Sequence, residues 1–568
     1  MHDRQISKGI PLGAHAASEI TRAANLWLLQ TTKRMEALRV PVTLTDGELI
    51  DLATKSAKKA LGLAEITVTV TVQALRQRMA AFCAGYGIEP PTEKTKDRPA
   101  IARMTCELWW RRALRKTQAR ALEAEAIKLG FVSRDREIYA SNVTTERRRQ
   151  QKKRNASALQ ATKAVNQDTG EIYTLDDLAA KSVANPKIRR GELMVRIKGF
   201  EHMAQGLGHV AEFVTITTPS KYHPKRTAKQ GYSIANPKYN GTTPREAQQY
   251  LTKLWAQIRA KLARLCVRVY GFRVTEAHHD GTPHWHLLLF MEAQHVGILR
   301  AVVRDYALRE DGNEAGAQRN RCDFKAIDPA KGTAAGYIAK YISKYIDGGG
   351  YQVQGDVDGG DHAAVTPSHR IEAWASTWGI RQFQQLGGAP VGVWREARRL
   401  AKDAQTTEIV QEVESAATAA NWRRFIELMG GVFVARKDLP LRVAYTREGE
   451  RWDFARQVPF EAALTRYGEQ AAGAVFGVRD CARGRSIQSR RYRWVLERSG
   501  AADAPWTCIN NCTGDKNDGQ SDSGHISREG QVGERTSAHQ NHGGGVYRAI
   551  ADRAGGDSLG VGGGEPRH

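Results

Sequence analysis

The stretch His279-Asp-Gly-Thr-Pro-His-Trp-His-Leu-Leu-Leu-Phe290 decides the fold at the centre of this chain. Its first residues predict a tight turn, because Asp, Gly and Pro favour the backbone angles that turns require. Residues 284–291 then read as a return strand, and residues 267–276 read as the strand that precedes the turn. The sequence therefore predicts a β-hairpin that begins at Val267 and ends at Met291.

This hairpin carries three candidate metal ligands. Side chains two apart on a strand point to the same face, so His284 and His286 can hold one ion while Trp285 packs on the opposite side. Glu276, on the other arm, points to the same face of the hairpin as the two histidines if the pairing is regular. Two imidazoles and one carboxylate leave positions open on a divalent ion for phosphate oxygens. Asp280 is the alternative third ligand, although an Asp beside Gly in a turn has a sufficient local role.

The metal hypothesis needs more support than the two histidines give. A His-x-His pair taken alone is more often structural or exposed than metal-binding. The acidic residue on the neighbouring arm and a row of tyrosines further along the chain favour the metal. The nearby His278 and His279 are interpreted as turn or DNA-contact residues.

The tyrosine row is the segment Tyr337-Ile-Ala-Lys-Tyr341-Ile-Ser-Lys-Tyr345. On a helix, residues four apart lie on one side and one turn apart, which places Tyr337 beside Tyr341. A separate apolar row can supply the contact with the core: Ile338, Ile342 and Ile346. A phenol needs cationic or metal help to become a nucleophile, and Lys340 and Lys344 can supply that field or hold a phosphate.

The charge of the chain favours a polyanionic partner. Lys and Arg outnumber Asp and Glu 85 to 61 over 568 residues, which gives a formal net charge of +24. Such an excess makes binding to nucleic acid salt-sensitive. No segment approaches the roughly 18 apolar residues of a membrane span, the first residues lack a signal-peptide core, and seven cysteines without framework spacing fit a reducing compartment. We therefore expect a cytoplasmic protein without a membrane partner.

Four regions are expected along the chain. Residues 1–190 read as mainly helical and basic. Residues 191–400 read as an α+β domain, with a central antiparallel sheet and flanking helices. Residues 401–500 read as helical or mixed, and residues 501–568 have the low-complexity composition of a disordered tail.

Local signals support the central domain. Phe213-Val-Thr-Ile-Thr217 alternates β-branched residues as strands do, and Pro219 ends it. Thr243 and Pro244 are suited to the N-cap and first position of a helix that extends to residue 265.

Outside this domain, the basic run 146–154 is interpreted as a solvated helix face or linker, with a phosphate-contacting arm as the alternative. Cys508 and Cys512 form a close pair that lacks the further ligands of a structural zinc site.

Three stretches together resemble the motifs of the HUH endonucleases, in the same order. They are Phe213-Val-Thr-Ile-Thr-Thr-Pro-Ser, the hairpin stretch 279–290, and Gly336-Tyr-Ile-Ala-Lys-Tyr-Ile-Ser-Lys. The chain is most similar to the replication gene A protein family of tailed bacteriophages and prophages. Further similar stretches are Asn185-Pro-Lys-Ile-Arg-Arg-Gly-Glu-Leu-Met, Asn236-Pro-Lys-Tyr-Asn-Gly and the segment from Trp378 to Trp394.

The resemblance implies a metal-dependent, site-specific endonuclease that starts rolling-circle replication in the cytoplasm of a bacterial host. It also implies that residues 191–400 are the HUH catalytic domain and that residues 1–190 bind origin DNA. Tyr341 or Tyr337 would attack single-stranded or supercoiled origin DNA, become linked to the 5′ phosphate and free a 3′-OH for the host polymerase. His284 and His286 match the family's metal ligands, while Glu276 matches less directly, because the acidic position varies. The metal would be Mg²⁺ or Mn²⁺, with no small-molecule cofactor. The chain has no Gly-x4-Gly-Lys-Ser/Thr motif, so a host helicase would open the strands.

Two other classes of protein remain as alternatives. A conjugative relaxase or a two-tyrosine transposase shares the site, but relaxases usually place the tyrosine ahead of the histidine motif, whereas here the tyrosines follow it. A non-catalytic basic DNA-binding protein explains the charge but leaves the ordered motifs unexplained. Tyr345 departs from the family pattern, which has a non-aromatic polar residue there, and we interpret it as a packing or DNA-contact residue.

Overall fold

The hairpin expected around residue 280 forms the middle of a five-stranded antiparallel sheet with the order β8-β3-β7-β6-β9. Its strands are β8 (Cys322–Ala326), β3 (Val210–Ile216), β7 (Pro283–Met291), β6 (Tyr270–Ala277) and β9 (Phe383–Leu386). Gly281 closes the β6–β7 turn at a positive φ of 83°, which residues with a side chain rarely adopt. The expected hairpin is confirmed, although its first strand begins at Tyr270 rather than at Val267.

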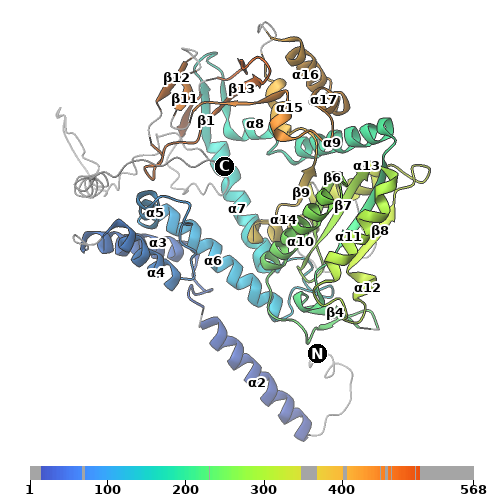
Figure 1. The fold of residues 1–568 in the computed structure, drawn as a ribbon. Helices are drawn as coiled ribbons and strands as arrows, with labels where there is room; N and C mark the ends of the chain where they lie inside the picture. The colour runs from blue at the N-terminus through green and yellow to red at the C-terminus, as the bar shows by residue number, and fades with distance from the viewer. Residues whose placement is uncertain are drawn as a thin grey trace, which may run out of the picture.

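The computed structural model describes most of the chain. The described residues are 14–36, 38–66, 71–228, 230–346, 367–400, 406–447, 450–453, 458–461, 464–492 and 494–498. The tail expected at residues 501–568, with Cys508 and Cys512, lies outside them. The architecture is mixed helix and strand with antiparallel sheets, as expected for an α+β chain (Figure 1).

Helices cover both faces of the central sheet, so the three inner strands β3, β7 and β6 bury side chains on both sides. On one face pack α10 (Pro244–Arg264) and α11 (Val296–Leu308). Thr243 caps α10 through a reciprocal capping box with Glu246, as the Thr243-Pro244 pair predicts. On the other face pack α9 (Pro186–Leu207), α13 (Ala334–Ile346) and α14 (Pro367–Trp378).

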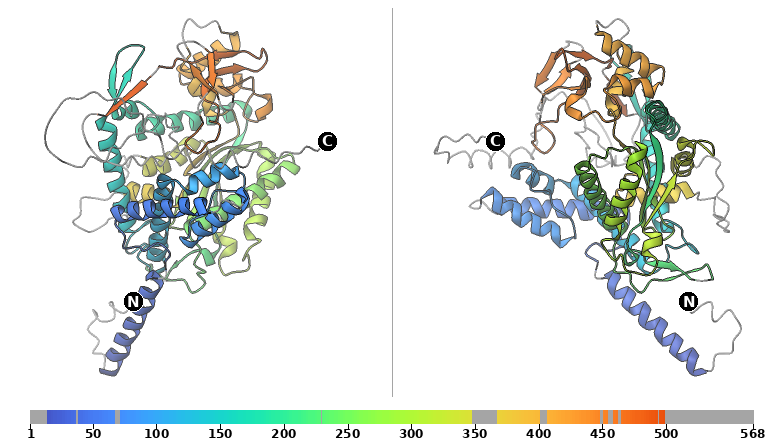
Figure 2. Two further views of the ribbon diagram at one scale, coloured as in Figure 1. Left: turned by 90° about the vertical axis from the view of Figure 1, so that its left-hand side faces the viewer. Right: turned by 45° about the vertical axis from the view of Figure 1, so that its right-hand side comes forward.

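Helices dominate the chain before α9. The helices there are α2 (Ala14–Glu36), α3 (Asp46–Ile66), α4 (Val72–Gly85), α5 (Asp97–Met104), α6 (Glu107–Lys128), α7 (Asn142–Ala161) and α8 (Leu175–Ala180). Helices α3 to α6 share a core of their own, and α2 projects away from it (Figures 1 and 2). The basic run 146–154 lies in α7, where Arg148 and Lys152 form ion pairs with Glu372 of α14. Part of its charge therefore attaches this region to the central domain.

The residues after β9 form a mixed unit whose helices are continuous with the core around α9. Its elements are α15 (Val391–Ala397), α16 (Glu408–Thr418), α17 (Trp422–Leu428), β10 (Leu441–Tyr445), β11 (Glu450–Asp453), β12 (Val458–Glu461), β13 (Val475–Asp480), β14 (Ser486–Gln488) and β15 (Trp494–Arg498). Strand β15 pairs with β1 (Thr162–Asn166), which also pairs with β2 (Ile172–Thr174), as Figure 2 shows. This contact joins segments that are far apart in the sequence.

Close packing also attaches this unit to the central domain at Gly199 of α9. A Cβ placed there would lie 2.5 Å from the Cβ of Trp422, so only glycine lets the fully buried indole approach.

Among the described residues, no helix is both long and apolar enough to cross a membrane.

Candidate active site

The β6–β7 register brings the three predicted ligands together on one face of the sheet. Glu276 pairs directly with His284, and His286 follows on the same face. Glu276 Oε2 lies 2.8 Å from His286 Nε2 and 3.3 Å from His284 Nε2. Their ligand atoms all lie within 4.8 Å of one another, and they form the only such group of His, Cys, Asp or Glu among the described residues.

Neighbouring side chains fix the orientation of His286. Its Nδ1 forms a 3.1 Å hydrogen bond with Thr215 Oγ1 on β3, which leaves Nε2 directed toward Glu276. The ring of Phe213, two residues earlier on β3, stacks on the imidazole at 5.4 Å between centroids. Hydrogen bonds of this kind set the ring orientation of metal-binding histidines.

The electrostatics of the cluster suit a cation. Burial opposes ionisation of Glu276, but hydrogen bonds from His284 and His286 outweigh it and hold the pKa of this carboxyl well below its usual range. A buried carboxylate that stays charged next to two imidazole nitrogens is a donor set for a divalent ion. The residues present therefore fit the metal that the sequence predicts.

Tyr341 is the tyrosine that contacts this cluster. Its ring lies 4.6 Å from the ring of His286 and stacks on Phe213 at 5.9 Å. Burial raises the pKa of its phenol, and the negative charge of Glu276 raises it further. Ile338 and Ile342 of the same helix are fully buried in the core, which confirms the separate apolar row and leaves Tyr341 free to face the cluster.

Tyr337 lies one helical turn earlier and is in a different environment. It contacts Phe213 with centroids 6.1 Å apart, and Lys325 Nζ of β8 lies 5.2 Å from its ring centroid. The structure therefore separates two tyrosines that the sequence presents as equivalent. Lys340, Lys344 and Tyr345 belong to α13, but their side chains lie outside the described part of the structure.

A second group of polar residues adjoins the cluster at the turn of the hairpin. The ring of His278 lies 4.0 Å from that of His284 and 5.0 Å from that of His223. Asp280, the alternative third ligand, lies with this group instead, because its Oδ2 is 3.1 Å from His223 Nδ1. His223 was not expected here, since nothing in its local sequence distinguishes it.

Comparison with known proteins relates the chain to phage replication. The family model described as "Bacteriophage replication gene A protein (GPA)" matches residues 46–349. The chain is 34% identical over 536 residues to the probable replication protein P12 of Pseudoalteromonas phage PM2, covering 88% of this chain and 80% of that protein. It is 41% identical over 439 residues to the replication gene A protein of Escherichia phage 186, covering 74% and 60%.

A third relative has an enzymatic name. The probable replication endonuclease from a prophage-like region of Salmonella paratyphi A is 32% identical over 438 residues, covering 73% of this chain and 52% of that protein. The chain thus spans little more than half the length of the phage 186 and Salmonella proteins. No solved structure matches the chain significantly.

Proposed function

The chain belongs to the bacteriophage replication gene A protein family, and on this premise we propose that it is a DNA endonuclease that nicks a replication origin through a tyrosine. The observation that carries the proposal is the contact between Tyr341 and the cluster of Glu276, His284 and His286. A phenol beside residues that could hold a divalent cation is suited to attack a phosphodiester, because the cation would activate the phenol and polarise the phosphate. The endonuclease name of the Salmonella relative agrees with this chemistry.

In the proposed reaction, Tyr341 is the nucleophile. Its Oη forms a bond to phosphorus and loses its proton, while the bond from phosphorus to the 3′ oxygen breaks and that oxygen takes up a proton. The protein keeps the 5′ phosphate as a phosphotyrosine, so the energy of the broken bond is retained for rejoining. Attack by the freed 3′-OH reverses each of these changes.

Glu276, His284 and His286 would hold Mg²⁺ or Mn²⁺, which as a Lewis acid polarises a phosphate oxygen and offsets charge on the phenolate. Burial and the carboxylate of Glu276 both raise the pKa of Tyr341, so the phenol stays protonated when no cation balances that carboxylate. We therefore propose that cleavage depends on the metal.

Tyr337 is proposed as the second nucleophile, because it lies one turn from Tyr341 on α13 and packs on the same Phe213 ring. It would cut the origin regenerated after one round of rolling-circle replication. Lys340 and Lys344 are proposed to hold the phosphate or stabilise the phenolate. The freed 3′-OH would prime the host polymerase in the host cytoplasm, with a host helicase opening the strands.

The proposal is tested by incubating the full chain with single-stranded DNA and Mg²⁺ and locating the nucleotide-bearing peptide by mass spectrometry. The adduct is expected on Tyr341. Tyr341→Phe should slow adduct formation by about a hundredfold or more, since the nucleophile is lost, whereas Tyr337→Phe should have a much smaller effect on the first cut.

The control is Tyr306→Phe, which removes a phenol from the opposite face of the sheet and should leave the rate unchanged. A Tyr337/Tyr341 double variant that still forms an adduct would refute both assignments. If chelation of divalent cations leaves the wild-type rate intact, the metal is not required.

A further inference from the structure

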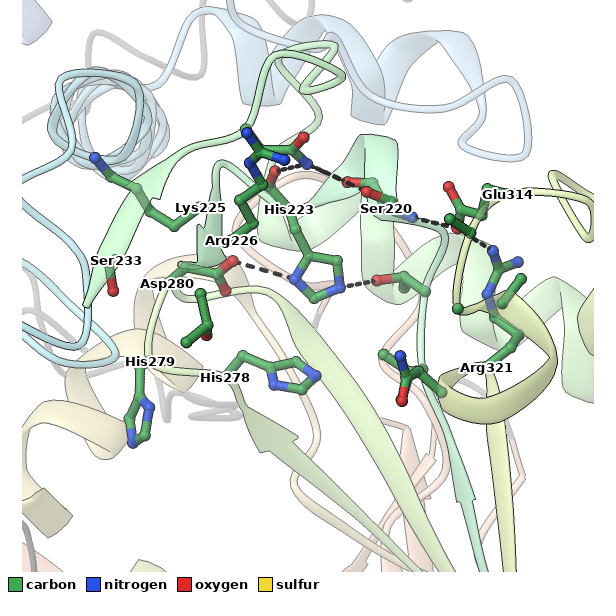
Figure 3. A pocket seen from close by; sticks show the side chains of 18 of the residues that line it. Ser220, His223, Lys225, Arg226, Ser233, His278, His279, Asp280, Glu314 and Arg321 are labelled. Atoms are coloured by element: carbon green, nitrogen blue, oxygen red, sulfur yellow. Dashed lines mark hydrogen bonds and ion pairs between the residues drawn. The ribbon is translucent and has the colours of Figure 1, made fainter. Parts of the chain in front are cut away.

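A pocket opens beside the cluster, where the β6–β7 turn meets four other segments (Figure 3). Its lining comes from Arg134, residues 217–223, the hairpin of β4 (Lys225–Thr227) and β5 (Ser233–Ala235), the turn at residues 278–280, and residues 314–321. Its volume of about 350 Å³ falls in the size range of ligand sites. We refer to it as the His223 pocket.

The His223 pocket is lined by four Lys or Arg side chains and by two Asp or Glu side chains, which leaves an excess of positive charge. Arg134, Lys225 and Arg226 line it and make no ion pair with any residue in the described part of the chain. Arg321, by contrast, is paired with Glu314 at 2.5 Å and donates to backbone carbonyls. Unpaired cations around a polar hollow attract an anion, and a DNA strand provides one at each nucleotide.

The imidazole that gives the pocket its name is held in a fixed orientation. His223 Nδ1 lies 3.1 Å from Asp280 Oδ2, and His223 Nε2 lies 3.1 Å from Thr218 Oγ1. Asp280 is itself fixed, because its Oδ1 accepts a hydrogen bond from the backbone N–H of Thr282 at 3.0 Å. Figure 3 shows Asp280, His223 and His278 gathered at one side of the pocket. Pre-oriented polar groups of this kind fix how a ligand binds.

A continuous row of rings connects the pocket with the proposed nucleophile. The row, with the centroid separations of successive rings, is Tyr341 to His286 at 4.6 Å, His286 to His284 at 4.6 Å, His284 to His278 at 4.0 Å and His278 to His223 at 5.0 Å. The metal-ligand histidines are therefore in the middle, with Tyr341 at one end and the His223 pocket at the other.

This order gives the pocket a place in the reaction, on the assumption that the proposed function is correct. In phosphoryl transfer the attacking and leaving oxygens lie roughly in line on opposite sides of phosphorus. With phosphorus at the cluster and the attacking oxygen on the Tyr341 side, the leaving 3′ oxygen is directed toward the His223 pocket. We propose that this pocket binds the nucleotide on the 5′ side of the cut, whose 3′-OH is released, and retains it for rejoining.

Photo-crosslinking on the full chain tests this assignment. Sequences that the wild-type protein cleaves are selected from a random single-stranded DNA pool by covalent capture, which defines the cut. Thiothymidine is then placed on the 5′ side or the 3′ side of the cut in separate oligonucleotides. The 5′-side probe should crosslink to peptides from residues 217–236 or 278–282, and the 3′-side probe should not.

A variant pair extends the test to rejoining. Arg226→Ala removes an exposed cation of the pocket, and Arg259→Ala removes an equally exposed cation from α10 on the other face of the sheet. Arg226→Ala should lower the 5′-side crosslink and raise the concentration of 3′-OH oligonucleotide needed for half-maximal rejoining, each by about tenfold, as expected for one lost phosphate contact. Arg259→Ala should match the wild type.

The outcomes separate this inference from the function on which it rests. A wild-type protein that forms no adduct overturns both. An adduct accompanied by crosslinking of the 5′-side probe outside the pocket, by crosslinking of the 3′-side probe inside it, or by equal losses in the two arginine variants overturns only the assignment of the pocket.

Discussion

The two faces of strand β7 differ in chemistry although both are buried. One face carries His284 and His286, which are 8% and 7% exposed and contact mainly polar partners. The other face carries Trp285 and Leu287, which are fully buried against α10 and α11. Trp285 uses its one polar group in a 3.0 Å hydrogen bond to Gln248 of α10.

The contrast between the two faces of β7 shows how the cluster of Glu276, His284 and His286 is kept rigid. Burial of apolar side chains on the α10 face stabilises β7, and β7 then holds the two imidazoles at a fixed distance from the carboxylate on the neighbouring strand β6. Alternation along β7 therefore places the two imidazoles on one face, beside the buried Leu288 and Phe290, and only apolar side chains with Trp285 on the other. Substitutions on the two faces should separate these roles.

The largest effect is expected from removing both imidazoles. His284→Ala with His286→Ala should abolish covalent adduct formation and Mn²⁺ binding, because it removes two of the three proposed metal ligands. Circular dichroism and salt-sensitive DNA binding should persist. His295→Ala, in the short 3₁₀ helix that follows β7, is the control and should retain adduct formation. If the double variant still cleaves DNA, the histidine face of β7 has no role in the chemistry.

Truncation on the other face should affect stability instead. Leu287→Ala should lower the free energy of unfolding by about 2–5 kcal/mol, because it leaves a cavity in a close-packed core. At a temperature where the variant is folded, its adduct rate should remain near that of the wild type. Denaturant unfolding measures the first effect, with the exposed Leu265→Ala as control. A folded Leu287→Ala variant that cannot cleave would show that the two faces are not separable.

A smaller effect is expected from the hydrogen bond that orients His286. Thr215→Val keeps the shape of the side chain but removes the Oγ1 partner of His286 Nδ1. Loss of such a partner should weaken Mn²⁺ binding by about tenfold, measured by calorimetry. Thr275→Val, on the opposite face of β6, is the matched variant. Equal losses in both would mean that general stability, rather than ring orientation, controls the metal site.

The smallest effect is expected in the rate at which a native thiol is alkylated. Cys322 of β8 lies in the core of the α10 face, and burial raises its pKa, so the reactive thiolate is scarce at pH 8. It should be alkylated much more slowly than the exposed Cys266, and the rate should increase as pH rises toward the raised pKa. Leu287→Ala should accelerate its labelling, whereas the double histidine variant should not. Acceleration in the histidine variant would indicate that the two faces unfold together.

Much of the candidate site could be predicted because it depends on local geometry. The hairpin follows from turn residues between two strand patterns, and the same parity then places Glu276, His284 and His286 on one face. The isoleucine row of α13 likewise follows from helical periodicity, and its burial is confirmed. The metal role of the cluster and the roles of Tyr341 and Tyr337 stay predictions, as do the boundaries of the four regions.

The sequence alone determined the hairpin, the ligand face and the tyrosine row, since each rests on periods of two or about four residues within one element. Only the tertiary structure decided that Tyr341, rather than Tyr337, lies against His286, because that depends on how α13 packs over β3 and β7. The His223 pocket also came only from the fold. Its walls come from five separate segments between residues 134 and 321, and a local sequence pattern cannot predict which distant segments come into contact.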